Sequence, residues 1–71
     1  RRVLFRSKTN VTEESKAVEI ISILSCHLPA CKINFDLQDC DNILRVKGDI
    51  VSCTQIIELV NSTGFVCSLL D

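Results

Sequence analysis

The sequence predicts an α+β fold of one domain, residues 1–71, in which strands and helices follow the order βαββαβ. Two segments, residues 12–27 and 52–63, place apolar residues at helical spacing. They alternate with segments in which apolar and polar residues take turns, as on a half-buried strand. The chain has room for a single core, which must be built from Ile, Leu and Val because aromatic residues make up only 4%.

Residues 3–9 predict the first strand. Ser7 interrupts its apolar alternation, which makes it the least regular of the four strands. The two faces of this strand carry Val3 and Phe5 on one side, and Leu4, Arg6 and Lys8 on the other.

The first helix is expected to begin at Thr12, whose hydroxyl is a good N-cap. Glu13 and Glu14 follow and face the positive end of the helix. Asn10 with Glu13 offers a competing capping box. The apolar stripe of this helix consists of Ala17, Ile20, Ile21, Leu24 and Leu28.

Pro29 cannot continue a helix, so the first helix must end by Cys26 or His27. Residues 31–38 and 43–47 then alternate apolar and polar residues on either side of a polar turn, which predicts a β-hairpin. The charged residues of the hairpin are interpreted as surface charge that discourages pairing at a sheet edge. They are Lys32, Asp36, Arg45 and Lys47.

Ser52 and Gln55 have the spacing of a capping box and predict the start of the second helix. Gly64 is a typical helix stop. Residues 65–70 predict the closing strand, with Phe65, Cys67 and Leu69 on one face. The apolar stripe of the second helix consists of Cys53, Ile56, Ile57 and Val60.

This order of elements is that of a ferredoxin-like sandwich, a four-stranded antiparallel sheet with both helices on one face. Right-handed crossovers place the first and third strands in the middle and leave the second and fourth at the edges. Many functions use this architecture, so function has to be argued from sites.

The composition argues against nucleic acid and membrane partners. The net charge of −1 provides no field for nucleic acid. The basic cluster of Arg1, Arg2, Arg6 and Lys8 is interpreted as a solvated strand edge. No apolar run approaches the ~18 residues of a membrane-spanning helix, and no signal-peptide pattern is visible. We therefore expect a cytoplasmic protein whose segment does not enter a membrane.

The five cysteines are odd in number and irregular in spacing, which indicates free thiols in a reducing compartment. Cys31, Cys53 and Cys67 fall on core-facing positions and are expected to be inert. Cys40 lies in the hairpin turn and is expected to be the exposed thiol.

The segments LRVKGDIVSCTQIIELVNSTGF and KINFDL carry a resemblance to a known family. They resemble the third strand, glycine turn, Ser-capped helix, terminal Gly-Phe and hairpin strand of the heavy-metal-associated domain, the copper-chaperone fold. The resemblance covers the chain after Thr9. It implies the sandwich described above and a metal site, M-x-C-x-x-C, at the start of the first helix.

Laid over this chain, that motif falls on Val11, Thr12, Glu13, Glu14, Ser15 and Lys16. Its two cysteine positions become Glu13 and Lys16, so both soft ligands are missing. The Lys16 ammonium has no lone pair for a metal, and Glu13 and Lys16 are better explained as an ion pair at i,i+3 spacing. The family's way of binding Cu(I) is therefore not expected here.

One other cluster has metal-ligand residue types, namely Cys26, His27 and Cys31. Its spacing is not that of a known zinc or copper site, so small buried cysteines and a loop histidine are the simpler interpretation. The single histidine has no evident partner for nucleophilic catalysis, so we expect no enzymatic activity.

Three functions remain open. The first is a non-enzymatic interaction or regulatory module without cofactor, which docks a protein through residues 11–16 and the Gly64-Phe65 turn, as the resemblance implies. The second is binding of Cu(I) or Zn(II) through Cys26, His27 and Cys31. The third is a small-molecule-sensing domain of the ACT type, which has the same order of elements and dimerises by its sheet edges.

Overall fold

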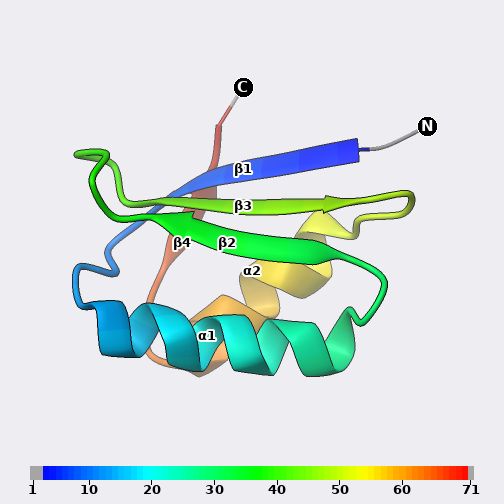
Figure 1. The fold of residues 1–71 in the computed structure, drawn as a ribbon, viewed down its shortest axis with the longest axis horizontal. Coiled ribbons are helices and arrows are strands. Elements are labelled where there is room, and N and C mark those ends of the chain that lie inside the picture. Colours follow the sequence, from blue (N-terminus) through cyan, green and yellow to red (C-terminus); the bar gives the residue numbers. More distant parts are fainter. Residues whose placement is uncertain (1–2, 71) are drawn as a thin grey trace.

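The computed structural model describes residues 3–70, and its order of elements confirms the predicted βαββαβ pattern. Both helices cover the same face of the sheet, and the described chain leaves the opposite face open (Figure 1). Arg1 and Arg2 of the predicted basic cluster lie outside the described residues. The elements are β1 (Val3–Thr9), α1 (Glu14–His27), β2 (Lys32–Asp36), β3 (Ile43–Gly48), α2 (Cys53–Ser62) and β4 (Cys67–Leu69).

The four strands form one antiparallel sheet in the order β2-β3-β1-β4. The prediction that the first and third strands lie in the middle is therefore confirmed. Phe5 pairs with Val46 across β1 and β3, and Phe35 pairs with Leu44 across β2 and β3. This register turns the apolar residues of three strands toward the helices, because successive side chains of a strand point to opposite faces.

The core lies between this face of the sheet and the two helices. Each large apolar side chain buried here contributes about 1.5–3 kcal/mol relative to an exposed one. Ser7, which interrupts the apolar pattern of β1, is completely buried with them. The core cluster consists of Phe5, Val11, Ala17, Ile20, Leu24, Leu44, Val46, Ile56 and Val60.

The start of α1 differs from both predicted caps. The N-cap is Glu13, which makes no side-chain capping bond, so the assignment of Thr12 is wrong. The capping box of Asn10 and Glu13 is also wrong, because the Asn10 side chain instead accepts a hydrogen bond from the amide of Val66. The long-range hydrogen bond between Asn10 and Val66 has therefore replaced the predicted local one at the start of α1.

The other helix signals behave as predicted. The α1 helix ends at His27, and Leu28 leaves helical angles before Pro29. The Ser52 hydroxyl accepts from the Gln55 amide at 3.3 Å and caps α2. Gly64 adopts a φ of +92° just beyond α2, in the region that favours glycine.

Two strands are shorter than predicted. β2 ends at Asp36 because the Asp36 carboxylate accepts from the Gln38 amide and begins a turn. The predicted polar turn follows, with Asn42 at a φ of +49°. β4 begins only at Cys67, although the backbone of Val66, the residue before it, still bonds to Asn10 in the loop after β1.

The prediction that Cys53 faces the core is wrong, because Cys53 is exposed. Cys53 is the first residue of α2, and the first turn of a helix has no preceding turn to cover its side chains. The first buried residue of α2 is therefore Ile56. The pairing of Lys16 also differs. Its ammonium lies 3.8 Å from the Glu19 carboxylate, one turn further along the helix, rather than beside Glu13.

Candidate functional site

The two segments predicted to form an interaction surface meet at one end of the sheet. The Asn10 amide nitrogen donates to the Val66 carbonyl at 3.4 Å, and the Val66 amide donates to the Asn10 side-chain oxygen at 3.0 Å. These bonds join the loop before α1 to the chain just after Phe65. The predicted neighbourhood of the first loop and the Gly64-Phe65 turn therefore exists.

The side chains of this surface divide into one buried anchor and an exposed polar rim. Val11 is completely buried and belongs to the core, so it cannot contact a partner. Phe65 is half-buried and packs against the same core. The exposed residues of the surface are Thr12, Glu13, Glu14, Ser15, Lys16 and Gly64. This rim offers carboxylates, hydroxyls and one ammonium, and no thiol.

The alternative metal residues, Cys26, His27 and Cys31, lie where α1 turns into β2. His27 Nδ1 donates to the Ile23 carbonyl at 3.0 Å, since a carbonyl can only accept, which leaves Nε2 free. The Cys31 thiol points to the Ile50 carbonyl at 3.8 Å, while Cys26 is exposed. In this arrangement the three residues do not bring their ligand atoms together.

Within residues 3–70, three metal-ligand side chains converge only in the β2–β3 turn. Ligand atoms of Asp39, Cys40 and Asp41 lie within 4.8 Å of one another. The Asp39 carboxylate accepts from the Asp41 amide at 2.9 Å, so this turn has a structural explanation of its own. Cys40 is exposed, as predicted.

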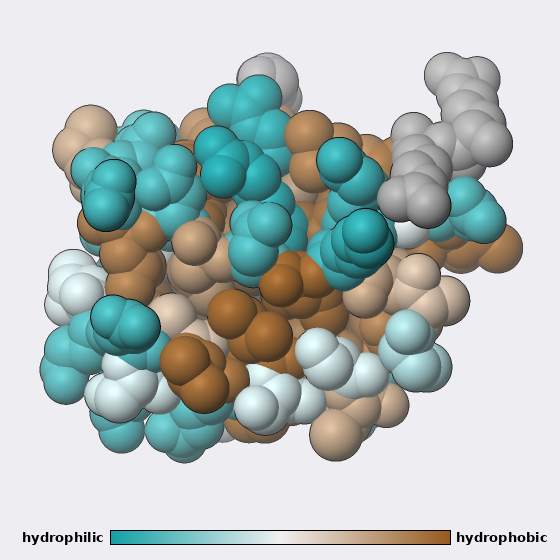
Figure 2. Space-filling view, in the orientation of Figure 1, coloured by the Kyte–Doolittle hydropathy of each residue, from teal (hydrophilic) through white to brown (hydrophobic). Residues whose placement is uncertain are grey.

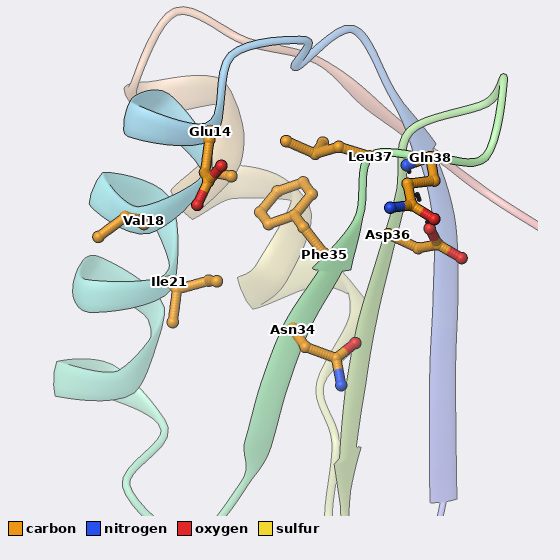
Figure 3. A pocket seen from close by; sticks show the side chains of 9 residues that line it. Glu14, Val18, Ile21, Asn34, Phe35, Asp36, Leu37 and Gln38 are labelled. Atoms are coloured by element: carbon orange, nitrogen blue, oxygen red, sulfur yellow. Dashed lines mark hydrogen bonds between the residues drawn. The ribbon is translucent and has the colours of Figure 1, made fainter.

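A groove between α1 and the edge strand β2 was not anticipated from the sequence. Its volume is about 440 Å³. In Figure 3 the side chains of Ile21, Phe35 and Leu37 extend into the space between the helix and the strand. Figure 2 shows a hydrophobic area between these two elements. The lining residues are Glu14, Ala17, Val18, Ile21, Asn34, Phe35, Asp36, Leu37 and Gln38.

One sequence signal does point to this groove. Val18 lies three residues before Ile21, at i,i+3 spacing, and so widens the apolar stripe of α1 on the side of Ile21. Val18 is 56% exposed, although it is a large hydrophobic residue. The apolar arc of α1 is therefore wider than the sheet covers. The groove has an apolar floor, with the Glu14 side chain at its rim, while the Asp36 carboxylate turns away from it toward Arg45 (Figure 3).

Cys67 is the one cysteine of the described chain with a clear pKa shift. Burial raises the pKa of its thiol, and an interaction with the Ser7 hydroxyl opposes this more weakly. The buried Ser7 hydroxyl has no partner that meets strict hydrogen-bond geometry, so its contact with the sulfur is weak. A raised pKa keeps the thiol protonated and poorly reactive.

No protein-family model matches the chain, and no curated protein or solved structure matches it either. Within residues 3–70, no helix has the length and apolar character needed to cross a membrane.

Proposed function

We propose that this chain is a non-enzymatic interaction module of ferredoxin-like architecture, similar to a heavy-metal-associated domain that has replaced its thiolate pair. The strand order and the two helices on one face support the architecture. A reducing, cytoplasmic setting belongs to this proposal, because all five cysteines are free.

The observation that carries the proposal is the pair of bonds between Asn10 and Val66. They hold the first loop against the turn after α2, where a metal-carrying relative would present its ligands to a partner. Glu13 and Lys16 occupy the two ligand positions, and both are exposed. Exposed opposite charges at this place suit contact with a protein surface better than a grip on a soft metal.

Rebuilding the lost site tests the resemblance directly. The double variant Glu13→Cys/Lys16→Cys restores two thiols at the start of α1, where the helix N-terminus favours their negative charge. Glu13 makes no side-chain capping bond, so its replacement should leave the helix intact. We expect this variant to bind one Cu(I) under reducing conditions, measured by native mass spectrometry against a competing chelator.

A matched control places the same two cysteines elsewhere on α1. The variant Glu19→Cys/Ser22→Cys has the same spacing on exposed positions, without the helix N-terminus. If the control binds Cu(I) as tightly as the rebuilt site, the resemblance fails. If the unaltered chain binds Cu(I) or Zn(II) stoichiometrically and loses it on Cys26→Ser or Cys31→Ser, the metal-binding alternative is correct instead.

The groove between α1 and β2 favours a second function, small-molecule sensing of the ACT type. Its volume of about 440 Å³ falls within the range of ligand pockets, and β2 is an edge strand that could pair in a dimer. Light scattering with and without each amino acid separates the two functions. A ligand-dependent dimer that is lost on Val18→Glu, and kept on Glu19→Gln, would establish sensing.

A further inference from the structure

The open face of the sheet carries nearly all the positive charge of the described chain. Alternation along the strands places these side chains opposite the buried residues Phe5, Leu44 and Val46. Within residues 3–70, Lys16 is the only lysine or arginine that lies elsewhere. The basic residues of this face are Arg6 and Lys8 on β1, Lys32 on β2, and Arg45 and Lys47 on β3.

The register brings like charges directly opposite one another. Arg6 pairs with Arg45 across β1 and β3, and Lys32 pairs with Lys47 across β2 and β3. Directly opposed like charges destabilise a sheet. The sheet therefore contains two unfavourable cross-strand pairs. Neutral polar residues at these positions would keep the face soluble without this repulsion.

Protection against edge pairing can explain Lys32 and Asp36, which lie on the edge strand β2, but not the rest of this charge. That interpretation, drawn from the sequence, requires the charges to lie on edge strands. β1 and β3 are the two central strands, so Arg6, Lys8, Arg45 and Lys47 guard no edge. Arg6 and Lys8 are exposed, as predicted, but their assignment to a strand edge is wrong for the same reason.

Most of these cations have no counter-charge in the described chain. The Arg45 guanidinium lies 3.6 Å from the Asp36 carboxylate, and Asp36 is the only acidic residue in the four strands. Within residues 3–70, no carboxylate lies within 4.0 Å of the charged groups of Arg6, Lys8, Lys32 or Lys47. The remaining acidic residues lie on the helices and in loops. The net charge of −1 is therefore the sum of a basic sheet face and acidic helices and loops.

We propose that this open face binds an acidic, extended segment of a partner protein. Residues i and i+2 of an extended chain lie about 6.6–6.8 Å apart, the same repeat that separates Arg6 from Lys8 and Arg45 from Lys47. A segment with a carboxylate at every second residue therefore matches Arg45 and Lys47 of the central strand β3, with Lys32 directly beside Lys47. Both arginines present planar donor groups that suit carboxylates.

The same face is poorly suited to the other polyanions. All three phenylalanines occupy core-side positions or the Phe65 turn, so within residues 3–70 no aromatic ring is available on the face for base stacking. Among the open-face positions of β1, β2 and β3, Leu4 is the one exposed large hydrophobic residue, at 48%, which offers a membrane little apolar anchorage.

The test uses the full chain and a fluorescent peptide of alternating Glu and Ser, followed by anisotropy. We expect binding that weakens as salt rises from about 20 mM to about 150 mM. The variant Lys32→Gln/Lys47→Gln should bind about tenfold more weakly, since it removes two charge-assisted contacts. It should be at least as stable as the unaltered chain, because it relieves the repulsion between the two lysines.

Lys16→Gln is the matched control, since it removes a cation from α1 and should leave peptide binding unchanged. The proposal is overturned if this control weakens binding as much as the double variant, or if the double variant binds as well as the unaltered chain. It is also overturned if single-stranded DNA, or vesicles containing phosphatidylserine, bind more tightly than the peptide and depend on Lys32 and Lys47.

Discussion

Asn10 and Val66 exchange two hydrogen bonds across 56 positions of the chain. The side-chain oxygen of Asn10 accepts at 3.0 Å from the Val66 amide, and the Asn10 amide donates to the Val66 carbonyl at 3.4 Å. One side chain thus fixes both the exit from β1 and the entry to β4. It also removes Asn10 from the capping of α1, which begins without a side-chain cap.

Replacing Asn10 by alanine should lower the free energy of unfolding by about 0.5–1.5 kcal/mol, the usual net contribution of one hydrogen bond. Asn10→Asp keeps an accepting oxygen and should retain most of the stability. Asn61→Ala, at an exposed position of α2, is the control and should cause no loss. Urea unfolding measures all three, and equal stability of Asn10→Ala and the unaltered chain would contradict the role given to this bond.

Ser7→Ala should stabilise the protein by about 1 kcal/mol, because it removes a buried hydroxyl that has no strict hydrogen-bond partner. Ser68→Ala, on the exposed side of β4, should change stability little. Thermal unfolding of the two variants gives the comparison. A loss of stability in Ser7→Ala would mean that the weak contact with Cys67 outweighs the cost of burying the hydroxyl.

Gly48→Ala should destabilise the protein by about 1–3 kcal/mol, because the added Cβ would lie 2.8 Å from the Cys31 sulfur. In a Cys31→Ala background the same substitution should cost much less, and this coupling is the measured quantity. Gly64→Ala meets no atom within 4 Å and is strained only by its φ of +92°, so its cost should not depend on Cys31. Equal costs of Gly48→Ala in both backgrounds would refute the contact.

The raised pKa of Cys67 predicts a loss of stability at alkaline pH. The unfolded thiol ionises near pH 8.5, while the folded thiol still holds its proton. The contribution of Cys67 to stability is therefore complete below that pH and is lost as pH rises toward the higher pKa of the folded state. Chemical unfolding between about pH 7 and pH 10 should show a smaller decline for Cys67→Ala than for the unaltered chain.

Thiol labelling gives an independent check of the same burial. At about pH 8, exposed Cys40 should react faster than half-buried Cys67, because reaction requires both access and the thiolate form. Peptide mass spectrometry after short labelling reads each site separately. Faster labelling of Cys67 than of Cys40 would be inconsistent with a buried, protonated thiol.

Local signals predicted the elements where a neighbour in the chain settles the conformation. Pro29 ends α1, Ser52 caps α2 through Gln55, and Gly64 takes the left-handed conformation that stops α2. The errors fall where a distant partner intervenes. Thr12 is not the cap of α1, because Asn10 bonds to Val66 and the chain stays extended through Glu13.

The sequence predicted less of the candidate sites than of the fold. The meeting of the first loop with the Gly64-Phe65 turn followed from a family resemblance, and the structure brings these segments together. The groove beside Val18 could not be predicted from the sequence, because it depends on how much of α1 the edge strand β2 covers. Periodicity identifies an apolar face, and only packing decides how much of that face remains exposed.

By itself, the sequence determined the order of elements, the apolar core and the central position of β1 and β3, since these depend on local periodicity and on the handedness of connections. The tertiary structure alone decided the charge pattern of the sheet. Arg6 and Arg45 are far apart in the chain and become neighbours only through the register of β1 and β3. Register depends on the packing of the whole core, and it turned scattered basic residues into one continuous face.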